Sequence, residues 1–300
     1  MKILLLGANG QVGWELRRSL SCLGTLVAVD RRSEPLSDLD NPVRAARFVR
    51  AIGPDVVINA AAYTAVDRAV EDQQAAWRVN ADAPAALAAA AEAMGALFVH
   101  FSTDYVFSGE GEGPWTELSP IGPINFYGRS KAAGEDGVRL SCRRHLIFRT
   151  SWVYASRGSN FLRKMLALAS EREALSVVDD QVGSPTAAEL IADVVSLAVR
   201  EERRARDVAA ICGTYHLAAR GSVSWHGYAT HAIDVARRLA TGWACRAERI
   251  EAVSSSRFPA KARRPMNSRL DSSKVERELG LTLPPWQTGV DRVVAELLGV

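Results

Sequence analysis

The sequence lacks the segments that would direct a chain to a membrane or out of the cell. Its N-terminal stretch, MKILLLGANG, is apolar for only about five residues before a glycine turn. A run of that length is too short for a secretory signal or a membrane span. We therefore expect a cytoplasmic location and no membrane partner.

The chain also has few cysteines and no large excess of charge of either sign. The four cysteines lie at positions 22, 142, 212 and 245, and none belongs to a CxxC pair. This spacing fits neither a zinc site nor a disulfide framework, so we expect reduced thiols, as in a cytosolic protein. The 37 lysines and arginines nearly balance the 34 acidic residues. A net charge of +3 gives no reason to expect a nucleic-acid partner.

Lysine is the rarest cation. Only five of the 37 basic residues are lysines, so 32 are arginines. Lys131 is the single lysine between Lys2 and Lys164. If any positive charge were sufficient at position 131, arginine is what the rest of this chain would supply. The lysine there indicates a function that a guanidinium group does not perform.

The 300 residues, 48% of them hydrophobic, are enough for one large domain or two unequal ones. In the first half, short apolar runs alternate with helical stretches. The runs predict buried strands at 2–6, 25–29, 55–59, 97–101 and 145–148. The stretches between them predict helices at 11–22, 42–52, 72–94 and 125–141. This alternation predicts an α/β fold with a doubly wound parallel sheet and helices on both faces.

After about residue 150 the alternation loosens. Here the sequence predicts helices at 158–170, 186–205, 224–241 and 287–298, and short strands near 174–179 and 214–218. We expect residues 1–150 to form a dinucleotide-binding domain. We expect residues 151–300 to form a smaller substrate-binding region, partly interleaved with the first.

A glycine-rich loop follows the first predicted strand and opens the first predicted helix. Gly7, Gly10 and Gly13 would allow backbone N–H groups to approach a pyrophosphate, which the helix N-terminus also favours. Three glycines alone are also typical of a structural turn. Here the strand before, the helix after and the acid at the end of the second strand favour dinucleotide binding.

That acid, Asp30, is expected to accept hydrogen bonds from the adenosine ribose. An acid at this place favours NADH, whereas a neighbouring arginine can accommodate the 2′-phosphate of NADPH. Arg31 and Arg32 follow directly, so both cofactors stay open, with a slight preference for NADPH. The arginine pair is also compatible with a solvated turn. Asp38 and Leu39 are expected to flank the adenine.

Tyr127 and Lys131 are four residues apart on a predicted helix, so they face the same way. A cation held near a tyrosine lowers its pKa, and a tyrosine poised nearer neutral pH is a better proton donor. A compact ammonium on a flexible stem can reach both the ring and the ribose hydroxyls. A surface helix pair with no function is the alternative that this spacing alone leaves open.

Thr103 ends the fourth predicted strand, where a doubly wound sheet forms its binding crevice. Its hydroxyl is expected to donate a hydrogen bond to a substrate carbonyl. Thr103, Tyr127 and Lys131 then form a set that orients the substrate, protonates it and tunes the proton donor. The five histidines, at positions 100, 145, 216, 226 and 231, are scattered and are interpreted as structural or surface residues.

Several stretches together resemble the extended short-chain dehydrogenase/reductase family. They are GANGQVG, NAAAYTAVD, STDYVF, YGRSKAAGE and FRTSWVY, with DDQVGSPTAAELIAD and ARRPMNSRLD nearer the end. The resemblance covers the chain from residue 1 to about 290 and is strongest to members that reduce dTDP-4-dehydrorhamnose. It implies a Rossmann domain and transfer of a hydride from NADPH or NADH to the C4 keto group of dTDP-4-dehydro-β-L-rhamnose, a sugar nucleotide.

The resemblance also implies roles for individual residues. Tyr127 would be the catalytic acid, Lys131 its partner, and Thr103 the residue that tunes both the carbonyl and the tyrosine. The residues implied to line the cofactor are Gly7, Gly10, Gln11, Val12, Gly13, Asp30, Asp38, Leu39, Ala62, Tyr63, Thr64, Tyr127 and Lys131. The residues implied to contact the sugar nucleotide are Thr103, Asp104, Tyr105 and Trp152.

Magnesium is often associated with this family, sometimes at a subunit contact, so a homodimer is a further expectation. Glu15, Glu189 and Glu296 are the candidate ligands, because a hard cation prefers oxygen donors. Three solvated helix acids are the competing interpretation.

Two other functions stay open from the sequence. The first is a sister enzyme, either an epimerase or a dehydratase acting on a sugar nucleotide. Family dehydratases carry Thr-Asp-Glu after the fourth strand, whereas this chain has Thr103-Asp104-Tyr105, which favours plain reduction. The second is a regulatory subunit that binds a dinucleotide without turnover, which the presence of both Tyr127 and Lys131 disfavours.

Overall fold

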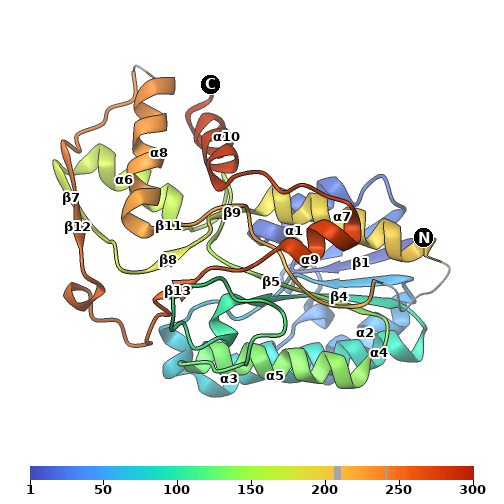
Figure 1. Ribbon diagram of the computed structural model, residues 1–300. Helices are drawn as coiled ribbons and strands as arrows, with labels where there is room; N and C mark the ends of the chain where they lie inside the picture. Colours follow the sequence, from blue (N-terminus) through green and yellow to red (C-terminus); the bar gives the residue numbers. More distant parts are fainter. Residues whose placement is uncertain (206–210, 241) are drawn as a thin grey trace.

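Figure 1 shows the computed structural model, which describes residues 1–205, 211–240 and 242–300. Its centre is a six-stranded sheet in the order β10-β5-β4-β3-β1-β2, with every neighbouring pair parallel. The strands of this sheet are β1 Lys2–Leu6, β2 Thr25–Val29, β3 Val56–Asn59, β4 Leu97–Thr103, β5 His145–Thr150 and β10 Gly213–His216. The predicted doubly wound parallel sheet is confirmed.

The order of the strands places the binding crevice. β2 lies on one side of β1 and β3 lies on the other, so the chain changes direction across the sheet at β1. Ligands of such sheets bind outside the carboxyl ends of the strands at this switch point. The loops that follow β1, β3 and β4 meet there, and they carry most of the predicted site residues.

Helices cover both faces of the sheet. In Figure 1, α1, α7 and α9 lie on one face, and α2, α4 and α5 lie on the other. These helices are α1 Gln11–Ser19, α2 Pro42–Ile52, α4 Ala83–Ala93, α5 Phe126–Ser141, α7 Ala188–Arg204 and α9 Ser273–Leu279. The alanine-rich α4 packs with Ala83, Ala88 and Ala90 fully buried. Small side chains let this helix lie close to its neighbours, as its sequence predicts.

The predicted helix at 72–94 is in fact interrupted. The structure has α3 at Gln73–Trp77, a π-helical turn at Arg78–Asp82, and then α4. Asn80 lies inside the π turn and is fully buried. Its side chain bonds both main-chain groups of Tyr63, at 2.9 and 3.0 Å. This tertiary contact accounts for the interruption. π-helical turns within α-helices are frequent at functional sites.

The rest of the chain forms a second hydrophobic core around α6, α8 and α10. Its helices are α6 Phe161–Glu171, α8 Trp225–Leu239 and α10 Trp286–Leu298. Its strands are β6 Val153–Tyr154, β7 Ala174–Val178, β8 Val182–Gly183, β9 Thr186–Ala187, β11 Val223–Ser224, β12 Arg249–Val253 and β13 Asn267–Ser268. The chain also has short 3₁₀ turns at Pro35–Ser37, Arg68–Val70, Asp104–Val106 and Ser255–Arg257.

The helices predicted after residue 150 are present with ends shifted by a few residues, and the predicted end at residue 241 lies outside the described residues. α9 and β12 were not predicted. Three late elements, α7, β10 and α9, return to the large sheet and its core. The domain boundary at residue 150 stays a prediction. Within the described ranges, no helix combines the length and the apolar character of a transmembrane segment.

Candidate active site

The glycine loop between β1 and α1 is shaped by two of its three glycines. Gly7 has φ +79°, and a Cβ there would lie 2.6 Å from the main-chain nitrogen of Ala61. A Cβ at Gly13 would lie 2.1 Å from the Gly7 carbonyl oxygen. These two positions therefore exclude any side chain, because the loop packs directly on the segment after β3 and on its own helix.

Gly10 is different, because space lies in front of it. A Cβ at Gly10 would meet only the Gly7 carbonyl oxygen, at 3.4 Å. Gly10 is the N-cap of α1, and no side chain from the described part of the chain caps this terminus. The first N–H groups of α1, at Gln11 and Val12, have no acceptor within their own helix. The loop therefore fits the pyrophosphate of a dinucleotide.

Asp30 lies one residue after β2 and is joined to the glycine loop. Its carboxylate accepts hydrogen bonds from the main-chain nitrogens of Ser33 and Arg32, at 2.8 and 3.0 Å, and from the side chain of Asn9. The bonds from Ser33 and Asn9 lower the pKa of Asp30 to about 2. The group is thus an anion at neutral pH, as a ribose acceptor requires. Arg31 and Arg32 are exposed beside it.

The other predicted cofactor residues lie on two segments near the same edge. Leu39 is buried, and the carboxylate of Asp38 accepts a hydrogen bond from the main-chain nitrogen of Asp40 at 3.1 Å. Tyr63 is fixed by Asn80, and its neighbours Ala62 and Thr64 are exposed. The sequence analysis missed Asn80. A polar residue inside an otherwise alanine-rich predicted helix is the signal that could have found it.

The start of α5 brings Tyr127 to the end of β4. Asn125 is the N-cap, and its side chain accepts a hydrogen bond from the Gly128 nitrogen at 2.8 Å. A Cβ at Gly128 would lie 2.1 Å from the Tyr105 carbonyl oxygen. The missing side chain lets the first turn of α5 press on the turn after Thr103. The rings of Tyr127 and Tyr105 meet edge to face, with centroids 5.6 Å apart.

Tyr127 and Lys131 face the same strand end, as their spacing predicts. The ring of Tyr127 contacts Tyr105, which follows β4 by two residues. The Nζ atom of Lys131 donates to the carbonyl oxygen of Phe101 at 2.6 Å. Phe101 lies two residues before the end of β4, so both helix side chains lie at the carboxyl end of this strand.

The predicted lowering of the Tyr127 pKa is wrong. Burial and the nearby carboxylate of Asp104 raise the pKa of Tyr127 well above its ordinary value. Burial also lowers the pKa of Lys131, to about 8, against the attraction of Glu135. Both groups are thus shifted toward their neutral forms.

Thr103 is held by the two residues that follow it. Its hydroxyl donates to the carboxylate of Asp104 at 3.0 Å and accepts from the Tyr105 nitrogen at 3.2 Å. Asp104 is buried, which raises its pKa to about 6. The Thr103 proton is thus directed at Asp104. A hydrogen bond from Thr103 to a substrate carbonyl would require this hydroxyl to rotate.

His100 lies beneath Lys131, although the sequence analysis set all the histidines aside. Its side chain is 1% exposed, with Nε2 3.3 Å from Lys131 Nζ and Nδ1 3.3 Å from Asn59 Nδ2. Burial and then the charge of Lys131 lower the pKa of His100 well below its ordinary value. Asn59 and His100 interrupt two otherwise apolar predicted strands, and this signal could have found them.

On the substrate side, Trp152 follows β5 with an unusual backbone. Its φ of +48° is the only positive value at a non-glycine residue in the described ranges. The ring stacks on Trp225, with centroids 3.4 Å apart and planes 9° apart. A Cβ at Gly183 would lie 2.6 Å from the Trp152 ring, so this glycine makes room for it. A strained residue held this firmly is typical of a functional site.

Comparison with known proteins agrees with this geometry. The family model described as the RmlD substrate binding domain matches residues 1–298. The chain belongs to this family. It is 47% identical over 298 residues to a dTDP-4-dehydrorhamnose reductase of Shigella flexneri, covering 99% of this chain and 98% of that one.

Two solved structures are similar over nearly their whole length. A dTDP-4-dehydrorhamnose reductase of Clostridium acetobutylicum superposes with a TM-score of 0.89 at 34% identity, and the match covers 100% of both chains. A dTDP-4-dehydrorhamnose reductase of Bacillus anthracis, in complex with NADP, has a TM-score of 0.86 at 33% identity and covers 98% of this chain and 99% of that one. These matches extend the RmlD family assignment to the fold of the entire chain.

The three predicted metal ligands do not form a cluster in this RmlD family member. Glu189 pairs with Arg292, and Glu296 accepts a hydrogen bond from Ser156 at 2.7 Å. Glu15 lies 3.6 Å from the guanidinium of Arg18. Across the described residues, no group of three or more metal-binding side chains is gathered. The structure gives no support to a magnesium site at these positions.

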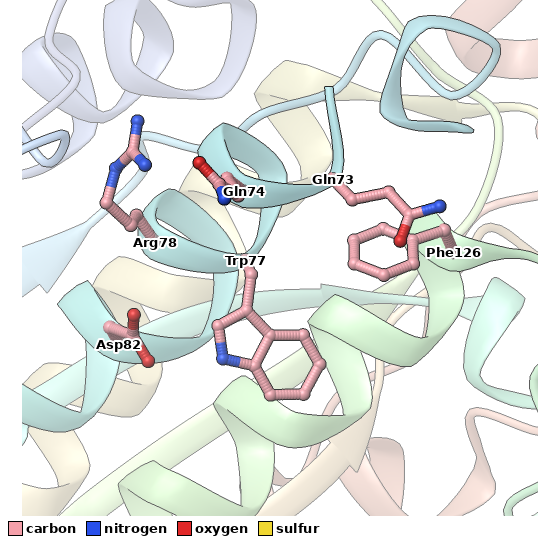
Figure 2. Close-up of a pocket in the computed structure, with 6 residues that line it drawn as sticks. All are labelled: Gln73, Gln74, Trp77, Arg78, Asp82 and Phe126. Atoms are coloured by element: carbon pink, nitrogen blue, oxygen red, sulfur yellow. The ribbon is translucent and has the colours of Figure 1, made fainter. Parts of the chain in front are cut away.

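Figure 2 shows a pocket of about 370 Å³ next to the site, lined by Gln73, Gln74, Trp77, Arg78, Asp82 and Phe126. The rings of Trp77 and Phe126 lie 6.2 Å apart across it. All six residues lie outside the predicted set, although Phe126 precedes Tyr127 on α5. The pocket is therefore not the crevice that holds the predicted catalytic residues.

Proposed function

We propose that this chain reduces the C4 keto group of dTDP-4-dehydro-β-L-rhamnose to dTDP-β-L-rhamnose, with Tyr127 as the proton donor. The observation that carries the proposal is the place of Tyr127, in the first turn of α5 and against the ring of Tyr105 at the carboxyl end of β4. The relatives named as dTDP-4-dehydrorhamnose reductases supply the substrate. The proposed enzyme is an oxidoreductase that depends on NADPH or NADH.

The nicotinamide cofactor supplies the hydride when it is bound. The chain's part is to bind and orient it. The N–H groups at Gly10, Gln11 and Val12 would hold the pyrophosphate, and the carboxylate of Asp30 would accept from the ribose. The family relative solved with NADP supports the use of NADPH, and the exposed Arg31 and Arg32 lie where they could meet a 2′-phosphate.

Tyr127 holds its proton until the reduction needs it. The high pKa set by burial and Asp104 keeps the phenol neutral at physiological pH. As the C4 oxygen gains negative charge, the phenol gives its proton to it. Trp152 and Tyr105 would shape the sugar side of the crevice.

A sister activity fits the site less well. Tyr105 stands where family dehydratases carry a glutamate, and its phenol packs against Tyr127. Burial raises the pKa of Tyr105 well above its ordinary value. A neutral phenol does not replace the carboxylate that elimination of water would need as a base.

Four predictions from the sequence are not used in this proposal. They are the homodimer, the magnesium ion, the cytoplasmic location and the domain boundary at residue 150. Each stays a prediction, and no step of the proposed reaction depends on any of them.

The test is a product assay. Purified protein is mixed with the thymidine-linked keto sugar and with NADPH or NADH in turn, and the nicotinamide absorbance is followed. We expect stoichiometric oxidation of the cofactor and formation of the reduced sugar. Cofactor binding without oxidation would instead support the regulatory-subunit alternative and contradict the proposal.

A further inference from the structure

The segment between β6 and α6 contacts the first turn of α1. Asn160, the N-cap of α6, donates a hydrogen bond from Nδ2 to Oε1 of Gln11 at 2.8 Å. The guanidinium of Arg157 lies 3.4 Å from the ring centroid of Trp14, three residues after Gln11 on α1. Residues three apart share a face of a helix, so this one segment holds one face of the helix that follows the glycine loop.

The hydrogen bonds of Asn160 fix the orientation of its amide. Its Oδ1 atom accepts from the Arg163 nitrogen at 3.0 Å, and its Nδ2 atom also donates to the Ala155 carbonyl oxygen at 2.8 Å. Turning the amide over would set Nδ2 against the Arg163 N–H and Oδ1 against the Ala155 carbonyl. The group that Asn160 presents to Gln11 is therefore a donor.

A donor at Asn160 fixes the amide of Gln11 in turn. Gln11 must present its carbonyl oxygen there, because its N–H₂ group cannot accept a hydrogen bond. The side chain passes close to Gly158, where a Cβ would lie 3.2 Å from Gln11 Cγ. Oε1 and Nε2 diverge from one carbon, so the N–H₂ group is turned away from Asn160. Within the described residues, Gln11 Nε2 has no hydrogen-bond partner.

The place of this amide in the fold gives the N–H₂ group its importance. Gln11 is the first residue of α1 and follows Gly10, in front of which space lies. The proposed site of the dinucleotide pyrophosphate is at this end of the helix. An N–H₂ group favours the oxygens of an anion. A carbonyl oxygen in its place would repel them and compete for the free N–H groups of α1.

We infer that Asn160 is a positioning residue of the cofactor site, because it holds the carbonyl of the Gln11 amide and leaves the N–H₂ group for a phosphate oxygen of the bound dinucleotide. The inference deepens the proposed function and rests on it for the presence of the dinucleotide. It gives the side chain of Gln11 a role beside that of its main-chain N–H. The sequence analysis missed Asn160, which lies 149 residues from Gln11 in the chain.

Asn160 also caps α6, and the two roles can be separated by substitution. Asn160→Ser keeps an N-cap, because a serine hydroxyl accepts from the first turn of a helix, but the side chain is too short to reach Gln11. Gln11→Leu removes the amide from the other side of the contact. The dissociation constant of NADPH, measured by nicotinamide fluorescence in the wild type, both single variants and the double variant, completes a double-mutant cycle.

We expect Asn160→Ser to weaken NADPH binding by about 10-fold, as for the loss of one hydrogen bond to a charged group. In the Gln11→Leu background the same change should alter the affinity by about 2-fold or less, because the amide that Asn160 orients is absent. Unchanged binding in Asn160→Ser, or the same loss in both backgrounds, would overturn the inference.

Ser224→Ala is the matched control. It removes the side-chain cap of α8, a helix of the same hydrophobic core as α6, at a place that does not touch Gln11. It should leave the affinity for NADPH unchanged. A loss equal to that of Asn160→Ser would show that any weakened cap in this core has the effect, and it would count against the inference.

Hydrogen exchange in the wild-type protein tests the N–H₂ group itself. The chain has five glutamines, so protein labelled at glutamine ¹⁵Nε2 gives few side-chain signals, and Gln11→Leu identifies the one from Gln11. We expect bound NADPH to slow the exchange of this group, because its protons are then donated to phosphate. Exchange as fast as in the free protein would overturn the inference.

These measurements are independent of turnover. If the cycle and the exchange agree with the inference while the keto sugar is not reduced, the proposed function is wrong and the role of Asn160 stands. If the sugar is reduced while Asn160→Ser binds NADPH as tightly as the wild type, the inference is wrong and the proposed function stands.

Discussion

The two halves of one face of α5 differ in whether their buried side chains are stabilised in the charged form. Tyr127, Lys131, Glu135 and Arg139 follow one another at four-residue spacing. In the second half, burial does not discharge Glu135, because the guanidinium groups of Arg149 and Arg139 lower its pKa. In the first half, Tyr127 and Lys131 have no such partners, and burial shifts the pKa of each toward its neutral form.

The difference shows what a buried group needs to remain charged. Glu135 is fully buried, yet it receives two hydrogen bonds from the guanidinium of Arg149. Such two-point contacts repay the loss of hydration. Lys131 is offered only a carbonyl oxygen and an imidazole. One half of the helix therefore joins α5 to the sheet, and in the proposed reaction the other half supplies the proton.

The largest expected effect comes from removing the phenol hydroxyl. Tyr127→Phe should reduce kcat by about 10²- to 10⁴-fold, because the general acid is lost. Cofactor affinity, measured by nicotinamide fluorescence, should change little, because the ring remains. Wild-type turnover in this variant would remove Tyr127 from the role of proton donor.

Arg149→Met removes the ion pair in the C-terminal half of α5 and leaves Glu135 buried without its principal partner. We expect a loss of about 3–5 kcal/mol in the free energy of unfolding, measured by denaturant titration. Arg139→Met is the matched control, because Arg139 is 34% exposed in its contact with Glu135. It should cost about 1 kcal/mol or less. Equal losses in the two variants would contradict the contrast between the halves.

Asp104 is a buried carboxylate without a cationic partner among the described residues, so its contribution to stability should depend on pH. Burial raises its pKa to about 6, above its value in the unfolded chain. The folded state therefore binds the proton more tightly, and stability falls as pH rises from about 4 to 6. Asp104→Asn should lack this loss, which amounts to about 3 kcal/mol for a two-unit shift. Unfolding curves of both proteins across that range test it, and parallel pH profiles would refute it.

The smallest expected effect comes from a substitution that keeps a cation at position 131 and changes the shape of the side chain. Lys131→Arg should lower kcat/KM by about 10- to 100-fold, because a planar guanidinium cannot take the place of the compact, buried amine that bonds the Phe101 carbonyl. Lys164→Arg, at an exposed position of α6, is the control and should be unaffected. If Lys131→Arg turned over like the wild type, charge alone would be sufficient there.

Local sequence was sufficient for much of the fold. The apolar runs predicted β1 and β2 with their observed ends, and the glycine loop was placed correctly between β1 and α1. These features depend on residues that are neighbours in the chain. The predicted helix at 72–94 was interrupted, because Asn80 bonds Tyr63, seventeen residues away.

The site was predicted less completely, for the same reason. The spacing of Tyr127 and Lys131 is local, and it correctly indicated that both face one strand end. The pairing of Asn59 with His100 depends on the register of two parallel strands, which no local pattern specifies. The stacking of Trp152 on Trp225 joins residues far apart in the chain. Only the fold shows that Lys131 has an imidazole rather than a carboxylate for a neighbour.

The central claim is that Tyr127 is a protonated phenol until the substrate takes its proton. Labelling the six tyrosines with ¹³Cζ tests it directly, with Tyr127→Phe identifying the signal. The account predicts that this signal stays that of a neutral phenol up to about pH 10. A tyrosinate signal that appears between about pH 6 and 8, and is absent from the variant, would contradict it.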